Sequence, residues 1–164
     1  MVNALAITLT GLIILTSSAV RADFRDGWKA YESGDFVGAY GQWQPLAEGG
    51  DPRAQFNLGV LYDEGRGVTR DRSKAIEWWT RASENGDPQA QHNLGLAYLA
   101  GTGVPRDFKQ AIHWLKKCAE QGIPRSQYTL GRIYDYGMGV LKNPEEAARW
   151  IGKAGTWPDS TTDG

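Results

Sequence analysis

Residues 51–86 read DPRAQFNLGVLYDEGRGVTRDRSKAIEWWTRASENG, and residues 87–122 read DPQAQHNLGLAYLAGTGVPRDFKQAIHWLKKCAEQG. The two stretches align without a gap, and about half of their positions are identical. A third copy occupies residues 123–155 and reads IPRSQYTLGRIYDYGMGVLKNPEEAARWIGKAG. Self-similarity at a period of 36 residues is typical of a solenoid, in which each repeat packs against its neighbours.

Each copy predicts two helices joined by a glycine turn. Asp51 and Pro52 favour an N-cap followed by proline in the first helical turn, and apolar residues then recur at spacings of three and four. Gly65 and Gly67 end this first helix. The N-cap position of the second helix holds Asp71, Asp107 and Asn143 in the three copies. The sequence therefore predicts an all-α fold, a right-handed α-solenoid of antiparallel helix pairs.

We call a set of equivalent positions in the aligned copies a column. The columns that repeat resemble those of the Sel-one-like repeat (SLR), a relative of the tetratricopeptide repeat with a longer loop between its helices. The resemblance rests on the pattern Ala-x-x-x-Leu-Gly-x-x-Tyr-x-x-Gly-x-Gly-Val, which begins at Ala54, followed by Asp, Ala, Trp, a small residue and Gly. It covers three repeats, residues 51–86, 87–122 and 123–155. The resemblance implies a protein–protein adaptor rather than a particular reaction.

The two ends of the chain differ from the repeats. Residues 4–20 are apolar and uncharged, and Val20-Arg21-Ala22 fits a small-x-small cleavage site, so residues 1–22 are interpreted as a signal peptide. The segment before the apolar run has no Lys or Arg, which leaves an uncleaved membrane anchor as the alternative. Residues 23–50 predict an atypical, tetratricopeptide-like helix pair that caps the stack, and residues 156–164 a polar tail. We expect secretion across an inner membrane into the periplasm.

The composition and residue spacing do not indicate a catalytic, metal-binding or nucleic-acid-binding site. A formal net charge of −1 without a basic stripe argues against nucleic acid as a partner. The two histidines and the sole cysteine have no metal-ligand spacing, so we expect no metal, no cofactor and no enzymatic activity. Cys118 shares a column with Ala82 and Ala154, which favours a small buried side chain over a reactive thiol. Secreted SLR relatives that bind β-lactams carry a cysteine pair in each repeat, and those pairs are absent here.

A candidate binding surface comes from the columns that vary between repeats, because conserved columns build the stack. On the first helix of each repeat these columns share one face, which lines the concave groove in tetratricopeptide relatives. Phe56, His92 and Tyr128 are expected to form one row along it. Asn57 and Asn93 share the adjoining column, where they could bond either a ligand backbone or the neighbouring repeat. The complete set of candidate partner-binding residues is Arg53, Phe56, Val60, Asp63, Gln89, His92, Leu96, Arg125, Tyr128, Arg132, Asp135 and Tyr136.

Together these observations predict an exported, monomeric, non-enzymatic interaction module. Its groove would bind a peptide or a partner helix with apolar anchors and some acidic character, with Arg53 and Arg125 contacting carboxylate or carbonyl groups. A membrane is expected only through the signal segment, if that segment stays uncleaved. The alternatives are a structural or regulatory component of a bacterial envelope assembly, a plain solvated helix surface, and a hydrolase of β-lactam or cell-wall type.

Overall fold

The computed structural model describes residues 22–155, which form eight helices and no strand. The prediction of an all-α solenoid of helix pairs is thereby confirmed. Except for Ala22, the predicted signal peptide lies outside the described residues, as does the predicted tail at 156–164. The helices are α1 (Phe24–Glu32), α2 (Phe36–Glu48), α3 (Pro52–Glu64), α4 (Arg72–Glu84), α5 (Pro88–Ala100), α6 (Phe108–Glu120), α7 (Pro124–Tyr136) and α8 (Pro144–Ala154).

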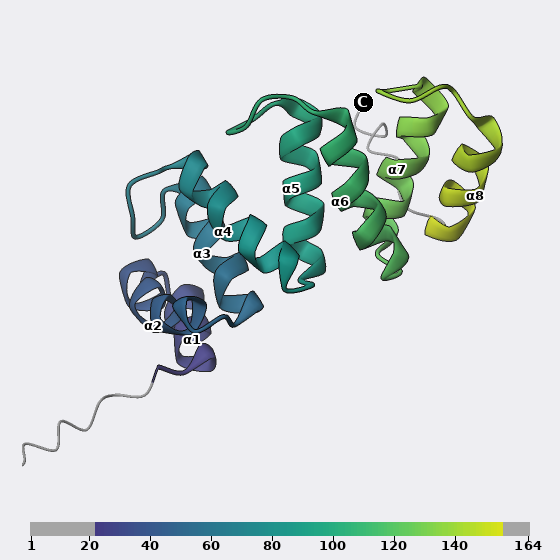
Figure 1. Cartoon of the computed structure of the whole chain (residues 1–164). Helices are drawn as coiled ribbons and strands as arrows, with labels where there is room; N and C mark the ends of the chain where they lie inside the picture. The colour runs from purple at the N-terminus through teal and green to yellow at the C-terminus, as the bar shows by residue number, and fades with distance from the viewer. Residues whose placement is uncertain (1–21, 156–164) are drawn as a thin grey trace, which may run out of the picture.

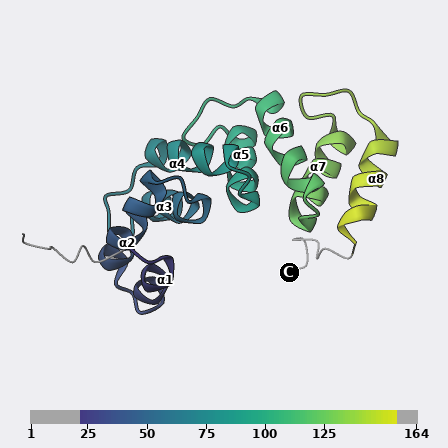
Figure 2. The same ribbon diagram turned by 60° about the horizontal axis from the view of Figure 1, so that its bottom comes forward.

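The helices stack in chain order into an arc (Figures 1 and 2), and each packs against the helix before it and the helix after it. Figure 2 shows the first helices of the pairs, α1, α3, α5 and α7, along the inner side of the arc. The second helices, α2, α4, α6 and α8, lie along its outer side. We call the inner side the inner face. The stacking places equivalent positions of successive first helices next to one another along it.

The helix starts are fixed by side-chain caps at the predicted positions. The carboxylate of Asp51 accepts hydrogen bonds from the backbone N–H groups of Arg53 and Ala54, which would otherwise have no partner in the first turn. The same role falls to Asp87 at α5 and to Asp71, Asp107 and Asn143 at α4, α6 and α8. The exception is α7, where Ile123 stands in the aspartate column and supplies no side-chain cap.

The glycines of the loop between the two helices serve two purposes. Gly65 ends α3 in the left-handed conformation, with φ of 70°, a region that glycine enters without the penalty of a Cβ. Gly67 lies against the start of α2, where an added Cβ would meet the carbonyl carbon of Phe36 at 2.5 Å. The second glycine therefore lets each loop pack on the second helix of the preceding pair.

A glycine in the middle of each first helix allows its partner helix to come close. A Cβ at Gly59 would lie 2.3 Å from Cδ1 of Trp79, whose indole Nε1 donates to the backbone carbonyl of Phe56 over 3.3 Å. Gly27 and Trp43 repeat the arrangement between α1 and α2. Trp43 and Trp79 thus lie buried between the two helices of their pairs.

A column of buried glutamines, which was not predicted from the sequence, joins the repeats. Gln55, Gln91 and Gln127 stand 36 residues apart, and each side-chain amide donates to a backbone carbonyl of the preceding second helix. The acceptors are the carbonyls of Ala47, Ser83 and Ala119, at 3.0–3.2 Å. These bonds fix the register between successive pairs and therefore the shape of the inner face.

Candidate binding surface on the inner face

Most of the predicted partner-binding residues lie at the surface of the first helices. Leu96 is 38 % exposed and Tyr136 is 54 % exposed, while Arg53, Gln89 and Asp135 are exposed as well. The remainder are half-buried, with the exception of His92. Phe56 and Val60 pack against the apolar cluster formed by α4, α5 and Trp114 of α6, so they are partly structural rather than plain surface residues.

His92 departs from the expected row because its side chain is only 7 % exposed. Its Nδ1 lies 2.7 Å from Oγ of Ser126, and that hydroxyl donates to Sγ of Cys118 over 2.9 Å. The thiol of Cys118 donates in turn to the carbonyl of Pro88. Burial, with a smaller contribution from the charge of Arg125, lowers the pKa of His92 to about 4, so the ring is neutral at pH 7. The expectation of a continuous exposed row through His92 is therefore wrong.

The two arginines expected to contact carboxylates are already engaged within the chain. The guanidinium of Arg53 pairs with Asp51 at 2.9 Å and lies over the ring of Phe24, 4.3 Å from its centroid. Burial opposes ionisation of Asp51, but the bonds from Arg53 and the helix backbone outweigh it and lower the pKa of the carboxyl group. Arg125 contacts the side-chain oxygen of Gln89 in the preceding repeat. Neither arginine by itself identifies an acidic partner.

On α7 the candidate residues form one connected group. The Arg132 guanidinium donates to the hydroxyl of Tyr128 over 2.8 Å and to that of Tyr136. It also lies over both rings, 5.7 Å and 4.7 Å from their centroids. The spacing of four residues places all three side chains on one helix face, so the C-terminal end of the inner face carries a cation between two phenols.

The row of candidate positions continues onto α1, which the sequence did not predict. The carbonyl of Phe24 accepts the indole N–H of Trp43 as that of Phe56 accepts the indole N–H of Trp79, so Phe24 and Phe56 occupy equivalent positions. Trp28, one turn after Phe24, is 45 % exposed. The shorter loop of the first pair changes the spacing between α1 and α2, so α1 does not align with α3 at the 36-residue period. Gly27, which contacts Trp43 as Gly59 contacts Trp79, is the signal in the sequence that could have revealed the equivalence.

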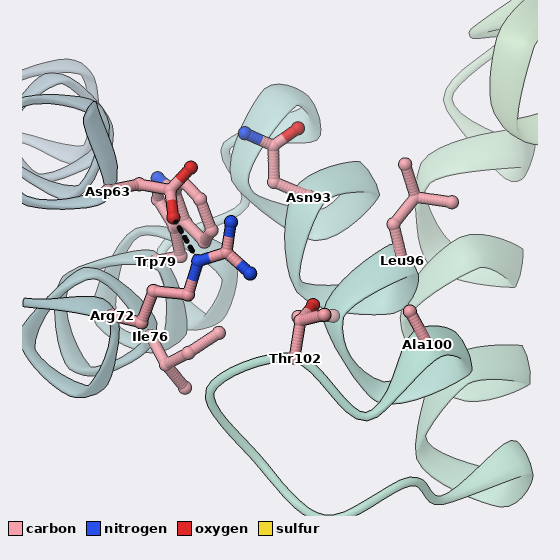
Figure 3. Close-up of a pocket in the computed structure, with 9 residues that line it drawn as sticks. Asp63, Arg72, Ile76, Trp79, Asn93, Leu96, Ala100 and Thr102 are labelled. Atoms are coloured by element: carbon pink, nitrogen blue, oxygen red, sulfur yellow. Dashed lines mark hydrogen bonds and ion pairs between the residues drawn. The ribbon is translucent and has the colours of Figure 1, made fainter.

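Two pockets lie at successive junctions along this face. The first has a volume of about 290 Å³, and Figure 3 shows its lining side chains. Asp63 and Leu96 belong to the predicted set, but other lining residues come from α4 and from the loop after α5. The added residues include Arg72, Ile76, Trp79 and Thr102. These residues could not be predicted from the spacing of residues along the first helices, because that spacing says nothing about which side chains of other elements lie nearby.

The second pocket lies between α1 and α3 and has a volume of about 480 Å³. Its lining residues are Phe24, Arg25, Trp28, Lys29 and Asn57. Asn57 and Asn93 occupy the same column, and each lines one of the two pockets. Within residues 22–155 neither side-chain amide has a hydrogen-bond partner. Asn57 is nearly buried, with 9 % of its surface exposed, and Asn93 is half-buried.

The described part of the chain offers no metal centre and no membrane span. Among residues 22–155 no three His, Cys, Asp or Glu side chains gather in a way that could hold an ion. None of the eight helices is long and apolar enough to cross a bilayer. Cys118 is fully buried, as its alanine column predicted, and burial raises the pKa of its thiol.

Comparison with known proteins agrees with this architecture. The family model of the Sel1 repeat matches residues 52–87, 88–123 and 124–156. A solved Sel1 repeat protein from Oxalobacter formigenes superposes with a TM-score of 0.77 at 32 % identity, covering 80 % of this chain and 54 % of that one. A protective antigen present in uropathogenic Escherichia coli strains, which displays an SLR fold, gives a TM-score of 0.76 at 37 % identity, covering 80 % of this chain and 29 % of that one.

Two curated mammalian proteins are similar over a shorter stretch. The DAP3-binding cell death enhancer 1 of Mus musculus is 35 % identical over 71 residues, and that of Rattus norvegicus is 34 % identical over the same length. The match covers 43 % of this chain and 14 % of each relative. The chain therefore corresponds to a small part of those proteins and to about half or less of the two solved structures.

Proposed function

Because the chain belongs to the Sel1 repeat family, whose repeats are protein-interaction modules, we propose that it binds a segment of a partner protein on its inner face. The segment would be an extended peptide or a single helix, and the module would act without catalysis. The observation that carries this proposal is the pair of pockets at successive junctions, each lined by an asparagine of the same column. That a relative in mouse is called a DAP3-binding protein supports a protein as the class of partner.

The chemistry of the inner face supports a peptide-like occupant. Exposed Trp28, Leu96 and Tyr136 offer apolar anchoring of the kind that dominates binding energy in protein interfaces. The asparagine amides can both donate to and accept from a main chain. The phenols and the guanidinium of α7 add polar groups and aromatic rings at one end. Apolar contacts with regularly placed amides suit the alternating side chains and amides of an extended segment.

Site-specific photo-crosslinking tests this proposal. Leu96 is replaced by p-benzoylphenylalanine, and the matched control carries the same group at His113, an exposed position on α6 of the outer side. Irradiation in an extract of the source cells should yield a discrete adduct from position 96. An adduct from position 113, with none from position 96, would place the partner on the outer side and refute the proposal.

We further propose that the protein is exported and that residues 1–22 are removed. The apolar run at residues 4–20 and the small residues around Arg21 support cleavage after Ala22. Mass spectrometry of the protein from its native cells should then find Asp23 at the amino terminus. Recovery of chains that begin at Met1 or Val2 from the cytosol would contradict export.

A further inference from the structure

The pocket between α3–α4 and α5 has an apolar lining with one ion pair at its edge. Ile76 and Leu96 face it, together with Trp79 and alanines of α5. Nε of Arg72 donates to Oδ1 of Asp63 over 2.9 Å, as the dashed line in Figure 3 marks. These two are the charged residues of the lining, so the formal charge of the pocket is zero.

The orientation of Arg72 leaves its outer nitrogens available to a ligand. Figure 3 shows the guanidinium extending from Asp63 toward Asn93 and Thr102, across the mouth of the pocket. Within residues 22–155 its one recorded hydrogen bond is the one from Nε to Asp63. Asp63 therefore holds the guanidinium in place, while both Nη groups can still donate.

The ion pair is not a requirement of the repeat. In the following repeat Leu99 stands at the position of Asp63 and Phe108 at that of Arg72, and the helices there pair in the same way. The third repeat has Asp135 and Pro144 at these positions. The helix pairs of the neighbouring repeats therefore form without this ion pair.

We infer that this pocket is the subsite for one uncharged, apolar side chain of the partner segment, with Arg72 donating to the main-chain carbonyl beside that side chain. The inference rests on the proposed function and specifies what the partner presents. A volume of about 290 Å³ lies just below the range of pockets that enclose drug-sized ligands, and it suits a single side chain with its adjoining amide.

Charge balance favours an uncharged occupant over an acidic one. Asp63 already neutralises Arg72, so a second carboxylate on the guanidinium would lie near the first and repel it. A carbonyl oxygen accepts the same hydrogen bond without that repulsion. Asn93, which also lines the pocket, can bond the next amide of the same main chain.

The test selects binders from a random peptide library displayed on phage, with the immobilised protein of residues 23–164 as bait. The enriched peptides should share a Leu, Ile, Met or Phe whose replacement by Ala abolishes binding. Affinities for the selected peptides are then measured by fluorescence polarisation against two variants. Thr102→Trp fills the pocket mouth, and the double variant Asp63→Leu with Arg72→Phe introduces the residues of the following repeat.

The expected loss is at least about tenfold for Thr102→Trp and about three- to tenfold for the double variant, the range of a lost hydrogen bond. The matched control is Met138→Trp, at the same loop position of the third repeat, which should leave affinity unchanged. Selected peptides with an essential Asp or Glu, or with binding insensitive to both pocket variants, would overturn the inference while leaving the proposed function intact. A library without any enriched peptide would contradict both.

Discussion

Nδ1 of His92 lies 2.7 Å from Oγ of Ser126, at the buried junction between α5 and α7. Because the serine hydroxyl donates its hydrogen to Sγ of Cys118, its oxygen accepts from the imidazole N–H. The thiol donates onward to the carbonyl of Pro88. The three side chains thus form a directed chain of hydrogen bonds, and burial of His92 keeps the imidazole at its start neutral at pH 7.

Stability should fall in acid because of this histidine. Burial lowers its pKa to about 4 in the folded protein, against about 6.5 in the unfolded chain, so the unfolded state binds a proton first as the pH falls. The contribution of His92 is complete above about pH 6.5 and is lost toward pH 4, on the order of 2 kcal/mol. Urea melts at pH 7 and pH 4.5 should show a smaller loss of unfolding free energy in His92→Gln than in the wild type.

The control for that comparison is His113→Gln, which changes an exposed side chain. Asp87 acts in the opposite direction, since burial raises its pKa and its protonation in acid favours the folded state. The difference between variants therefore isolates His92. Equal acid destabilisation in His92→Gln and the wild type would show that the ring titrates freely.

The thiol of Cys118 should be unreactive in the folded protein. It is fully buried, and burial raises its pKa, so both access and the thiolate fraction are low. A thiol-specific chromogenic disulfide at pH 8 should label it only at the rate of unfolding, and immediately in urea. Labelling within seconds under native conditions would contradict the buried hydrogen-bond chain.

Much of the fold could be predicted from the sequence, because repetition reveals caps, loops and packing columns together. The position of His92 was missed although a signal existed. Ser126 stands in an alanine column, as does Cys118, and both depart from alanine at the same junction as His92 departs from Phe56. Three such departures at one junction indicate a buried polar network rather than a surface row. The site needed the structure more, since Arg72 and Trp79 reach the pocket from second helices that column variation on the first helix ignores.

Two glycine substitutions should have opposite effects on stability. Gly59→Ala brings a Cβ to 2.3 Å from the ring of Trp79, so the helices must separate, at a cost of about 1–3 kcal/mol. Gly41→Ala in α2 meets nothing within 4 Å and gains helix propensity, about 0.5–1 kcal/mol. Urea melts of both variants measure the two effects. A stabilising Gly59→Ala would refute the close packing of α3 on α4.

The buried hydrogen bonds of the glutamine column should stabilise the folded protein. Gln91→Leu removes the hydrogen bond to the carbonyl of Ser83 and the one accepted from Gln121, and it should cost about 1–3 kcal/mol. Gln44→Leu, whose amide bonds Glu48 at the surface of α2, should stay within about 0.5 kcal/mol. Thermal melts of the pair give the comparison. Equal melting temperatures would show that the buried amides do not hold the repeats in register.

The central claim, that the inner face binds the partner, is tested most directly with two variants of the protein used as baits. One variant is altered on the inner face and the other on the outer side. One bait carries Trp28→Ser, Leu96→Ser and Tyr136→Ser, the exposed apolar residues of the first helices. The other carries Glu77→Ala, His113→Ala and Arg149→Ala, exposed residues of the second helices. Proteins retained from one extract by each bait and by the wild type are quantified by mass spectrometry. The account predicts that a protein retained by the wild type is retained by the outer-side bait and lost from the inner-side bait, and the reverse pattern would contradict it.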